Sequence, residues 1–206
     1  MNIDYYLDHE HKNVIGWCDR DKAQMFYDII TKNKFTLSVE IGVFGGSSFV
    51  PQAIAMKTNG TGLVIGIDPW ENKAAIEEME NTANKRWWSD INFEEIYQKF
   101  LGFLKQYEVE NFSKIYRNKS ENIVNNFQDL SIDVLHIDGN HCEKLAYQDA
   151  LLFLPKIKKH GYIFFDDTSW SENGTEISTA KGLNYLLQYC EKICVTGKDC
   201  VVLRKM

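Results

Sequence analysis

The chain has 206 residues, a formal net charge of −6 and an isoelectric point near 5.4, and 44% of its residues are hydrophobic and 13% aromatic. This length fits one α/β domain, and the hydrophobic fraction is that of a globular protein and excludes a disordered chain. The acidic balance argues against a nucleic-acid partner, since phosphate binding depends on clustered Lys and Arg.

Two further classes are excluded by what the sequence lacks. It has no run of about 18 apolar residues, and its polar start lacks the apolar core of a signal peptide. We therefore expect no membrane partner and a cytoplasmic location. The five cysteines are odd in number and contain no CxxC pair, which argues against a disulfide framework and a zinc site.

The first part of the chain predicts a helix and then a binding loop. Residues 1–35 are expected to form an N-terminal helical segment, in which Ala23, Phe26, Tyr27 and Ile30 share one helical face. Residues 37–48, LSVEIGVFGGSS, predict a strand, a tight turn and a helix start. Free N–H groups at a helix start favour an anionic group, so this loop is predicted to bind a small polar cofactor.

The remaining elements alternate between strand and helix. Strands are predicted at 63–68, 113–117, 132–138 and 161–167, a terminal hairpin at 192–204, and helices at 49–57, 72–85, 91–107, 120–130, 143–159 and near 183–190. We expect Ser89 or Asp90 to cap the helix at 91–107, and Pro155 to kink or restart the one at 143–159. Residues 70–110 are interpreted as a variable insert between the second and third predicted strands.

This alternation predicts the fold class. Parallel neighbours need crossover helices, so we expect an α/β, Rossmann-like, seven-stranded, mostly parallel sheet with helices on both faces and a C-terminal antiparallel hairpin. Residues 1–206 are interpreted as a single domain. Ligands of such sheets bind beyond the carboxyl ends of the strands.

Acidic residues lie at several strand ends. Asp68 ends the second strand, and Asp138, Asp166 and Asp167 end the fourth and fifth. An acid after the second strand usually accepts hydrogen bonds from ribose hydroxyls. The dinucleotide fingerprint would need glycine at positions 44 and 47, which are Phe44 and Ser47 here, and this argues against a nicotinamide enzyme.

Together these motifs resemble the class I S-adenosylmethionine-dependent methyltransferases. Residues 40–48 are similar to the family's E/D-x-G-x-x-x-G loop, followed by IDPW at 67–70, and residues 136–168 are similar to the I-D-G-x-H and D-D pattern of small methyltransferases acting on sugars and natural products. The resemblance runs from about Asp19 to the end. It implies S-adenosylmethionine as cofactor, with these contact residues: Glu40, Gly42, Gly45, Ser47, Ser48, Asp68, Trp70, Ser120 and Asp138.

Individual roles follow from the same resemblance. Gly42 would approach the amino-acid end of the cofactor, Ser47 or Ser48 its carboxylate, and Asp68 its ribose. Ser120 would contact adenine, unless it is only a helix cap, and Trp70 would cover the ring.

The acids at the later strand ends resemble the metal triad of catechol and macrolide-sugar O-methyltransferases. Asp138, Asp166 and Asp167 would hold Mg²⁺, which suits carboxylate oxygens and leaves positions for acceptor hydroxyls. Alternatively, Asp167 caps its loop and Asp138 touches only the cofactor.

His141, with Asp138, is the catalytic candidate, since imidazole can take a proton near neutral pH. It could instead hydrogen-bond within the loop or ligate the metal, and Asn140 stands where sugar-modifying relatives often have an acid.

Four tryptophans are candidates for the acceptor side. Trp87 and Trp88 lie in the insert, where they would stack on an acceptor, form a dimer or membrane contact, or simply pack in the core. Trp17 and Trp170 are candidate lids over the site. His136 is interpreted as a core residue, and Asp149 as an internal hydrogen-bond anchor.

The predicted function is therefore a Mg²⁺-assisted O-methyltransferase acting on a hydroxyl of a sugar, a glycan precursor or a small natural product. A homodimer is compatible with the sequence. Two alternatives stay open: a non-catalytic S-adenosylmethionine-binding partner protein, and a metal-dependent hydrolase or hydroxylase.

Overall fold

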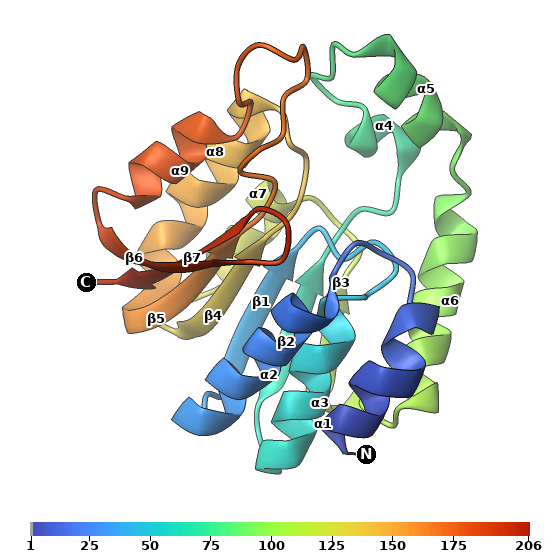
Figure 1. Ribbon diagram of the computed structural model, residues 1–206, viewed down its shortest axis with the longest axis vertical. Coiled ribbons are helices and arrows are strands. Elements are labelled where there is room, and N and C mark those ends of the chain that lie inside the picture. Colours follow the sequence, from blue (N-terminus) through green and yellow to red (C-terminus); the bar gives the residue numbers. More distant parts are fainter. Residues whose placement is uncertain (1) are drawn as a thin grey trace.

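Within residues 2–206, which the computed structural model describes, the chain folds around one seven-stranded sheet (Figure 1). The strands are β1 (Leu37–Ile41), β2 (Leu63–Ile67), β3 (Ser113–Tyr116), β4 (Ile132–Ile137), β5 (Ile157–Phe165), β6 (Cys190–Thr196) and β7 (Cys200–Lys205). They lie in the order β3-β2-β1-β4-β5-β7-β6. The first five are parallel, and β7 is antiparallel to β5 and β6. The predicted Rossmann-like fold with its terminal hairpin is confirmed.

Helices cover both faces of this sheet (Figure 1). One face carries α1 (Ile3–Tyr5), η1 (Tyr6–Glu10), η2 (His11–Asn13), α2 (Arg20–Asn33), α3 (Phe49–Asn59) and α6 (Phe93–Gln106). The other carries α7 (Ser120–Ile123), η4 (Val124–Asn126), α8 (Glu143–Phe153), η5 (Leu154–Lys156) and α9 (Ala180–Leu186). The short turn η3 (Glu110–Phe112) leads into β3. None of these helices is both long and apolar enough to cross a bilayer.

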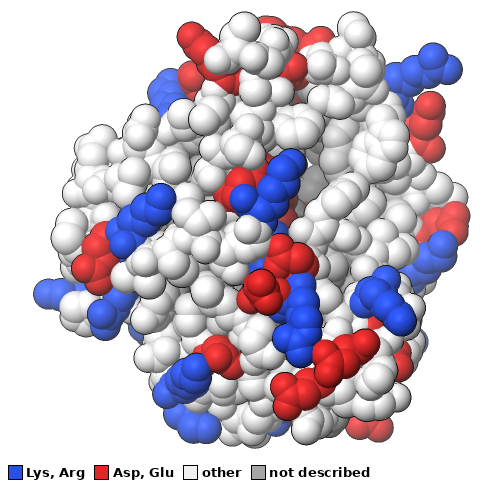
Figure 2. All heavy atoms as spheres, viewed as in Figure 1, with Lys and Arg blue, Asp and Glu red and all other residues white. Residues whose placement is uncertain are grey.

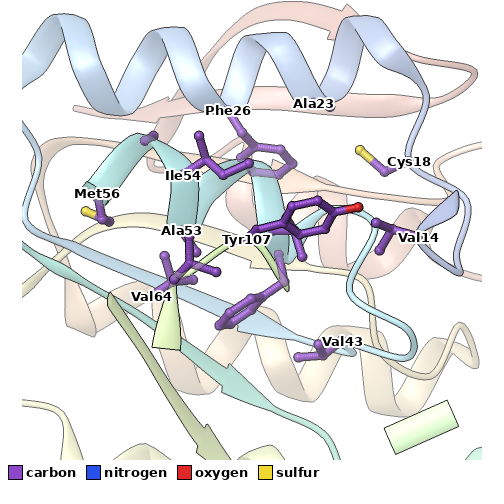
Figure 3. Packing of buried hydrophobic residues seen from close by; sticks show 14 of the residues in the cluster. Val14, Cys18, Ala23, Phe26, Val43, Ala53, Ile54, Met56, Val64 and Tyr107 are labelled. Atoms are coloured by element: carbon purple, nitrogen blue, oxygen red, sulfur yellow. The ribbon is translucent and has the colours of Figure 1, made fainter. Parts of the chain in front are cut away.

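The core beneath α2 and α3 explains how both helices are held. Figure 3 shows Phe26 of α2 and Ile54 of α3 among the packed side chains, with Tyr107 beside them. The side chain of Asp19 accepts a hydrogen bond from the Lys22 N–H, which caps α2 and starts the helix at Arg20. The fully buried Phe26 and Ile30 then fix which face of α2 points at the sheet.

Strand register brings polar groups together on this same face. Side chains alternate along a strand, so Val39 and Ile41 of β1 pack in the opposite core, whereas Glu40 points under α2 and α3. Glu40 is paired in register with His136 of β4, and His136 with Phe164 of β5. A buried acid and a buried imidazole therefore lie side by side near the carboxyl ends of their strands.

The insert differs from its prediction. The single helix expected at 72–85 is two short helices, α4 (Asn72–Ala75) and α5 (Thr82–Asp90), and the KRWWSD stretch is helical. The backbone takes a left-handed conformation at Glu78 between them, and the Asn81 side chain caps α5. The cap of α6 is Asn92, so the prediction of Ser89 or Asp90 was wrong.

The boundary between α8 and β5 also differs. The helix expected to run to residue 159 ends at Phe153, and Pro155 lies in the turn η5. Proline cannot donate the hydrogen bond that would continue the helix. β5 consequently begins at Ile157, four residues earlier than the predicted start.

We expect Gly42→Ala to lower the free energy of unfolding by roughly 4 kcal/mol or more, the range of a severe backbone clash. Gly42 has φ of +84°, and a Cβ there would lie 2.0 Å from the Asp138 carbonyl oxygen. Urea unfolding followed by circular dichroism measures this.

The matched control is Gly60→Ala at the end of α3. Its φ is +72°, and a Cβ there would meet nothing within 4 Å. This variant should lose only about 1 to 2 kcal/mol, the cost of the left-handed backbone. Equal losses in the two variants would show that close packing at Gly42 is unimportant.

Candidate active site

A cavity of about 580 Å³ lies beyond the carboxyl ends of the parallel strands. Its lining comes from the loops after β1, β2, β3, β4 and β5, from the segment at 16–22, and from the insert. Figure 2 shows this face hollowed beside acidic and basic side chains near the middle of the view. The predicted site residues that line the cavity are Gly42, Ser47, Ser48, Asp68, Ser120, Asp138, His141, Asp166 and Asp167.

Asp68 holds the glycine loop in shape. Its Oδ2 accepts hydrogen bonds from the N–H groups of Val43 (3.0 Å) and Phe44 (2.9 Å), and its Oδ1 accepts one from the Trp70 N–H (2.7 Å). Burial raises the pKa of Asp68, against these backbone hydrogen bonds, which lower it. Oδ1 has a single partner here, and a carboxylate oxygen can accept two. One acceptor position toward the cavity is thus compatible with the expected ribose contact.

The two serines of the loop are tied to the protein. Ser48 Oγ donates to Glu40 Oε1 (2.7 Å), and Ser47 Oγ accepts from the Cys18 N–H (3.2 Å). Glu40 also accepts from Gln52 Nε2 (2.5 Å) and is fully buried. Glu40 does not line the cavity, so the structure gives it a role in holding the loop and no route to a direct cofactor contact.

Trp70 and Gly45 also lie away from the cavity lining. The Trp70 side chain is 1% exposed, donates from Nε1 to the Phe44 carbonyl (2.8 Å) and packs on Tyr97 and Phe100. It anchors the loop after β2 in the core, and the predicted stacking on a cofactor ring does not fit this placement. Gly45 is required for packing, since a Cβ there would lie 2.4 Å from the Ile15 Cβ.

Ser120 meets Asp149 at the end of the cavity beside α8. Ser120 is the first residue of α7, and its hydroxyl donates to Asp149 Oδ1. Burial raises the pKa of Asp149 to about 7, although the hydrogen bond from Ser120 lowers it. The prediction of Asp149 as an internal anchor agrees with this contact, and both residues line the cavity.

His141 and Asp167 form a second pair of cavity-lining residues. His141 Nδ1 lies 3.2 Å from Asp167 Oδ2, and the His141 ring centroid lies 5.7 Å from that of Trp170. Both partners of the pair are partly exposed to the cavity. A carboxylate at Nδ1 fixes the ring and leaves Nε2 as the nitrogen that can take a proton.

A buried charge network lies behind this pair and consists of Glu40, His136, Asp166 and Lys22. His136 Nε2 is 3.1 Å from Asp166 Oδ2 and its Nδ1 is 3.5 Å from Glu40 Oε2. Lys22 Nζ forms an ion pair with the same Asp166 oxygen. His136 is fully buried, which confirms the core position expected from the sequence, and it contacts the carboxylates of this network.

Three members of the network have shifted pKa values. Burial lowers the pKa of His136, but Asp166 and Glu40 outweigh it and raise the pKa to about 10. Burial likewise opposes the charge of Lys22, and Asp138 and Asp166 raise its pKa above the ordinary value. The Asp166 pKa lies well below its usual range because His136 and Lys22 outweigh burial.

Exposed aromatic rings border the cavity mouth. Trp17 stacks on Phe44 with ring centroids 5.2 Å apart, and it lies 5.8 Å from Trp87 and 6.2 Å from Trp88. Trp17 is 67% exposed and Trp87 49% exposed. These rings leave an apolar, accessible surface beside the glycine loop.

The sequence matches a family model described as a methyltransferase domain over residues 39–168. This range contains the glycine loop, Asp68, Ser120 and the acids after β4 and β5. The chain belongs to this methyltransferase family. The match excludes Lys22, which precedes it.

Other comparisons agree on the methyltransferase fold. The O-methyltransferase NovP superposes with a TM-score of 0.72 at 12% identity, covering 100% of both chains. TomG from Streptomyces achromogenes, an O-methyltransferase involved in tomaymycin synthesis and solved with SAM, gives 0.63 at 12% identity over 90% of this chain and 79% of its own. An O-methyltransferase from Bacillus cereus in complex with SAH gives 0.64 at 11% identity over 99% and 90%.

A curated relative is the uncharacterized protein y4gI of Sinorhizobium fredii. It is 31% identical over 81 residues, which is 39% of this chain and 9% of the relative. The chain thus matches only a small part of that protein's length.

The predicted magnesium triad does not fit the carboxylates of this methyltransferase. Asp166 Oδ2 accepts from Lys22 and His136, and Asp166 Oδ1 accepts from the Asp167 N–H (3.2 Å). In residues 2–206, the cavity-side set of potential ligand atoms within 4.8 Å of one another belongs to Asp138, His141 and Asp167, and a second, buried set to His136, Asp166 and Cys200. The first set lacks Asp166. In the second set His136 and Cys200 are buried, and Asp166, which borders the cavity, is already engaged by Lys22 and His136.

The sequence analysis missed Lys22, the residue that engages Asp166. The signal was present, because Lys22 lies four and eight residues before Phe26 and Ile30 and so shares the buried face of α2. Leu145 and Gln148 of α8 were missed as lining residues as well.

We expect the contribution of Asp149 to the stability of the protein to fall as pH rises from about 4 to about 7. Its pKa is about 7 when folded and 3.8 in the reference state, so the folded chain binds the extra proton across this range. Asp149→Asn keeps an oxygen acceptor for Ser120 and cannot ionise.

Urea unfolding at several pH values measures the effect. The variant should lose less stability than the parent across this range, by up to a few kcal/mol, since each pKa unit is worth about 1.4 kcal/mol. The exposed Asp129→Asn serves as control. Parallel curves for the parent and Asp149→Asn would contradict the assignment.

Proposed function

We propose that this chain is an S-adenosylmethionine-dependent O-methyltransferase acting on a hydroxyl of a sugar, a glycan precursor or a small natural product. One observation carries the proposal. A single cavity is lined both by the glycine loop with Asp68 and Ser120, which suit the donor, and by the His141–Asp167 pair, which suits proton removal. A protein that only binds the cofactor would not need the His141–Asp167 pair.

The donor fits the side of the cavity formed by β1, β2 and α7. The loop after β1 brings bare backbone at Gly42 to the cavity, Asp68 Oδ1 retains an acceptor position, and Ser120 with Asp149 borders the end beside α8. S-adenosylmethionine, when bound, supplies the methyl group as an electrophilic sulfonium. Held between these groups, the donor would direct its reactive end toward the loop after β4.

His141 is the proposed base. Asp167 binds Nδ1, so the acceptor hydroxyl would give its proton to Nε2 as the oxygen attacks the methyl group. The carboxylate then stabilises the imidazolium that forms. Asp138, three residues before His141, lines the same cavity and would help orient the acceptor.

The acceptor would lie against the exposed aromatic rings beside the cavity. Trp17 and Trp87 offer exposed ring faces, and rings of this kind stack on sugar or aromatic groups. Asp138, His141 and Asp167 line the same cavity. This arrangement suits an acceptor with an apolar face and a hydroxyl that can reach His141.

Magnesium assistance stays a prediction from the sequence. Asp138, His141 and Asp167 are the residues that a cation could reach from the cavity, while Asp166 is engaged by Lys22. Methyl transfer with and without EDTA tests the requirement.

Calorimetric titration with S-adenosylhomocysteine is the first test of the function. We expect saturable binding by the parent protein and its loss in Asp68→Ala, because three loop N–H groups lose their acceptor. Asp129→Ala should bind normally. Absence of binding by well-folded parent protein would remove the cofactor from the proposal.

Turnover tests the assigned base. Once a panel of sugars and phenols has given an acceptor, His141→Gln should lower kcat by roughly 100- to 10,000-fold, the usual contribution of a general base. Binding of S-adenosylhomocysteine should be unchanged. If His141→Gln keeps full kcat, the base lies elsewhere, and binding without transfer across the panel would favour a non-catalytic role.

A further inference from the structure

Lys22 contacts Asp166, one of the carboxylates that the family resemblance assigns to a metal. Its ammonium pairs with Asp166 Oδ2, and the two side chains are 6% and 7% exposed. The same oxygen is 3.1 Å from His136 Nε2. Lys22 nevertheless borders the cavity, where Asp138 and Asp167 also lie.

We propose that Lys22 is a built-in cation that takes the place of a divalent metal ion at Asp166 and competes with such an ion for this carboxylate. Asp166 then serves as the partner of Lys22 and His136 and not as a metal ligand. The proposal concerns the occupancy of Asp166, and it can be tested without any turnover.

The position of Lys22 on α2 places its ammonium group beside Asp166. The Asp19 side chain accepts from the Lys22 N–H (2.8 Å), which fixes Lys22 in the first turn of α2. Phe26 and Ile30 lie one and two turns further along the same face and are fully buried. Lys22 therefore lies on the face of α2 that packs on the sheet, and its side chain meets Asp166 at the border of the cavity.

Charge balance explains why one cation excludes the other. A buried carboxylate needs a compensating charge, and Lys22 and His136 already supply two positive groups around Asp166 and Glu40. A divalent ion bound to Asp166 would place further positive charge beside Lys22 at short range, and the repulsion would be strong in this buried position. Removing the ammonium should instead leave an uncompensated acid that attracts a cation.

Mn²⁺ titration followed by electron paramagnetic resonance of the free ion tests this, using the full chain freed of metal with EDTA. Lys22→Met removes the charge and keeps most of the side-chain length. We expect this variant to bind Mn²⁺ roughly tenfold more tightly than the parent, or tighter still. Lys22→Arg, which keeps the charge, should bind as weakly as the parent.

Lys198→Met is the matched control, since Lys198 lines the same cavity and is not the lysine paired with Asp166. Its Mn²⁺ affinity should stay within about threefold of the parent's. Equal affinity in the parent and in Lys22→Met would overturn the proposal. A rise in Lys198→Met as large as that in Lys22→Met would do the same, because it would reduce the effect to net charge.

A second variant covers the case in which Lys22→Met fails to fold. Asp166→Asn in the parent background should leave weak Mn²⁺ binding unchanged, because Asp166 is not a ligand. If Asp166→Asn weakens Mn²⁺ binding about tenfold or more, Asp166 is a metal ligand and the proposal is wrong.

One consequence rests on the proposed function. Methyl transfer by the parent protein should be insensitive to EDTA, since Lys22 already provides the positive charge. If no acceptor is methylated, only the proposed function fails, and the Mn²⁺ titrations still decide the role of Lys22. If transfer occurs but requires Mg²⁺, the function stands and the substitution of the metal by Lys22 is wrong.

Discussion

The row of buried charges beneath α2 is the constraint on which the site depends. Glu40 on β1, His136 on β4 and Asp166 at the end of β5 lie on adjacent strands, and Lys22 closes the row from α2. Each carboxylate compensates a cation, so the loss of one member leaves its neighbour as an unpaired buried charge. The row also joins the two halves of the cavity, since Glu40 holds Ser48 of the glycine loop while Asp166 directly precedes Asp167.

The features of this site that depend on local sequence were predictable, whereas contacts between residues far apart in the chain were not. The strand, glycine loop and helix start at 37–48, and the acids that end β2, β4 and β5, were predictable because they follow from local periodicity and from a rule about strand ends. Asp68 was correctly expected at the cavity. Its three backbone partners were not, because they depend on the exact path of the loop through Phe44, a residue with φ of +49°.

The failures share a physical cause. In each case the role of the residue depends on a partner far along the chain. Trp70 donates a hydrogen bond to the Phe44 carbonyl, and Lys22 pairs with Asp166, 144 positions away. Single-sequence patterns give the face on which a residue lies but not the group it meets there. The two-helix insert was missed for a related reason, since the left-handed residue Glu78 lies in a turn between α4 and α5 that no glycine or proline marks.

The division of charge between the buried row and the cavity bears on which ligand the site prefers. Lys22 and His136 compensate Asp166 and Glu40 within the buried row, and Asp138 and Asp167 are among the acids that line the cavity beside it. Burial and the neighbouring Asp166 raise the pKa of Asp138 well above its ordinary value, against His136 and Lys22, which lower it. A cationic ligand beside Asp138 would favour the ionised carboxylate. Under the proposed function the donor is a sulfonium cation and its product a neutral thioether, so this surface attracts the donor more strongly than the product. The same buried row that fixes the glycine loop would thus also favour exchange of product for donor after each transfer.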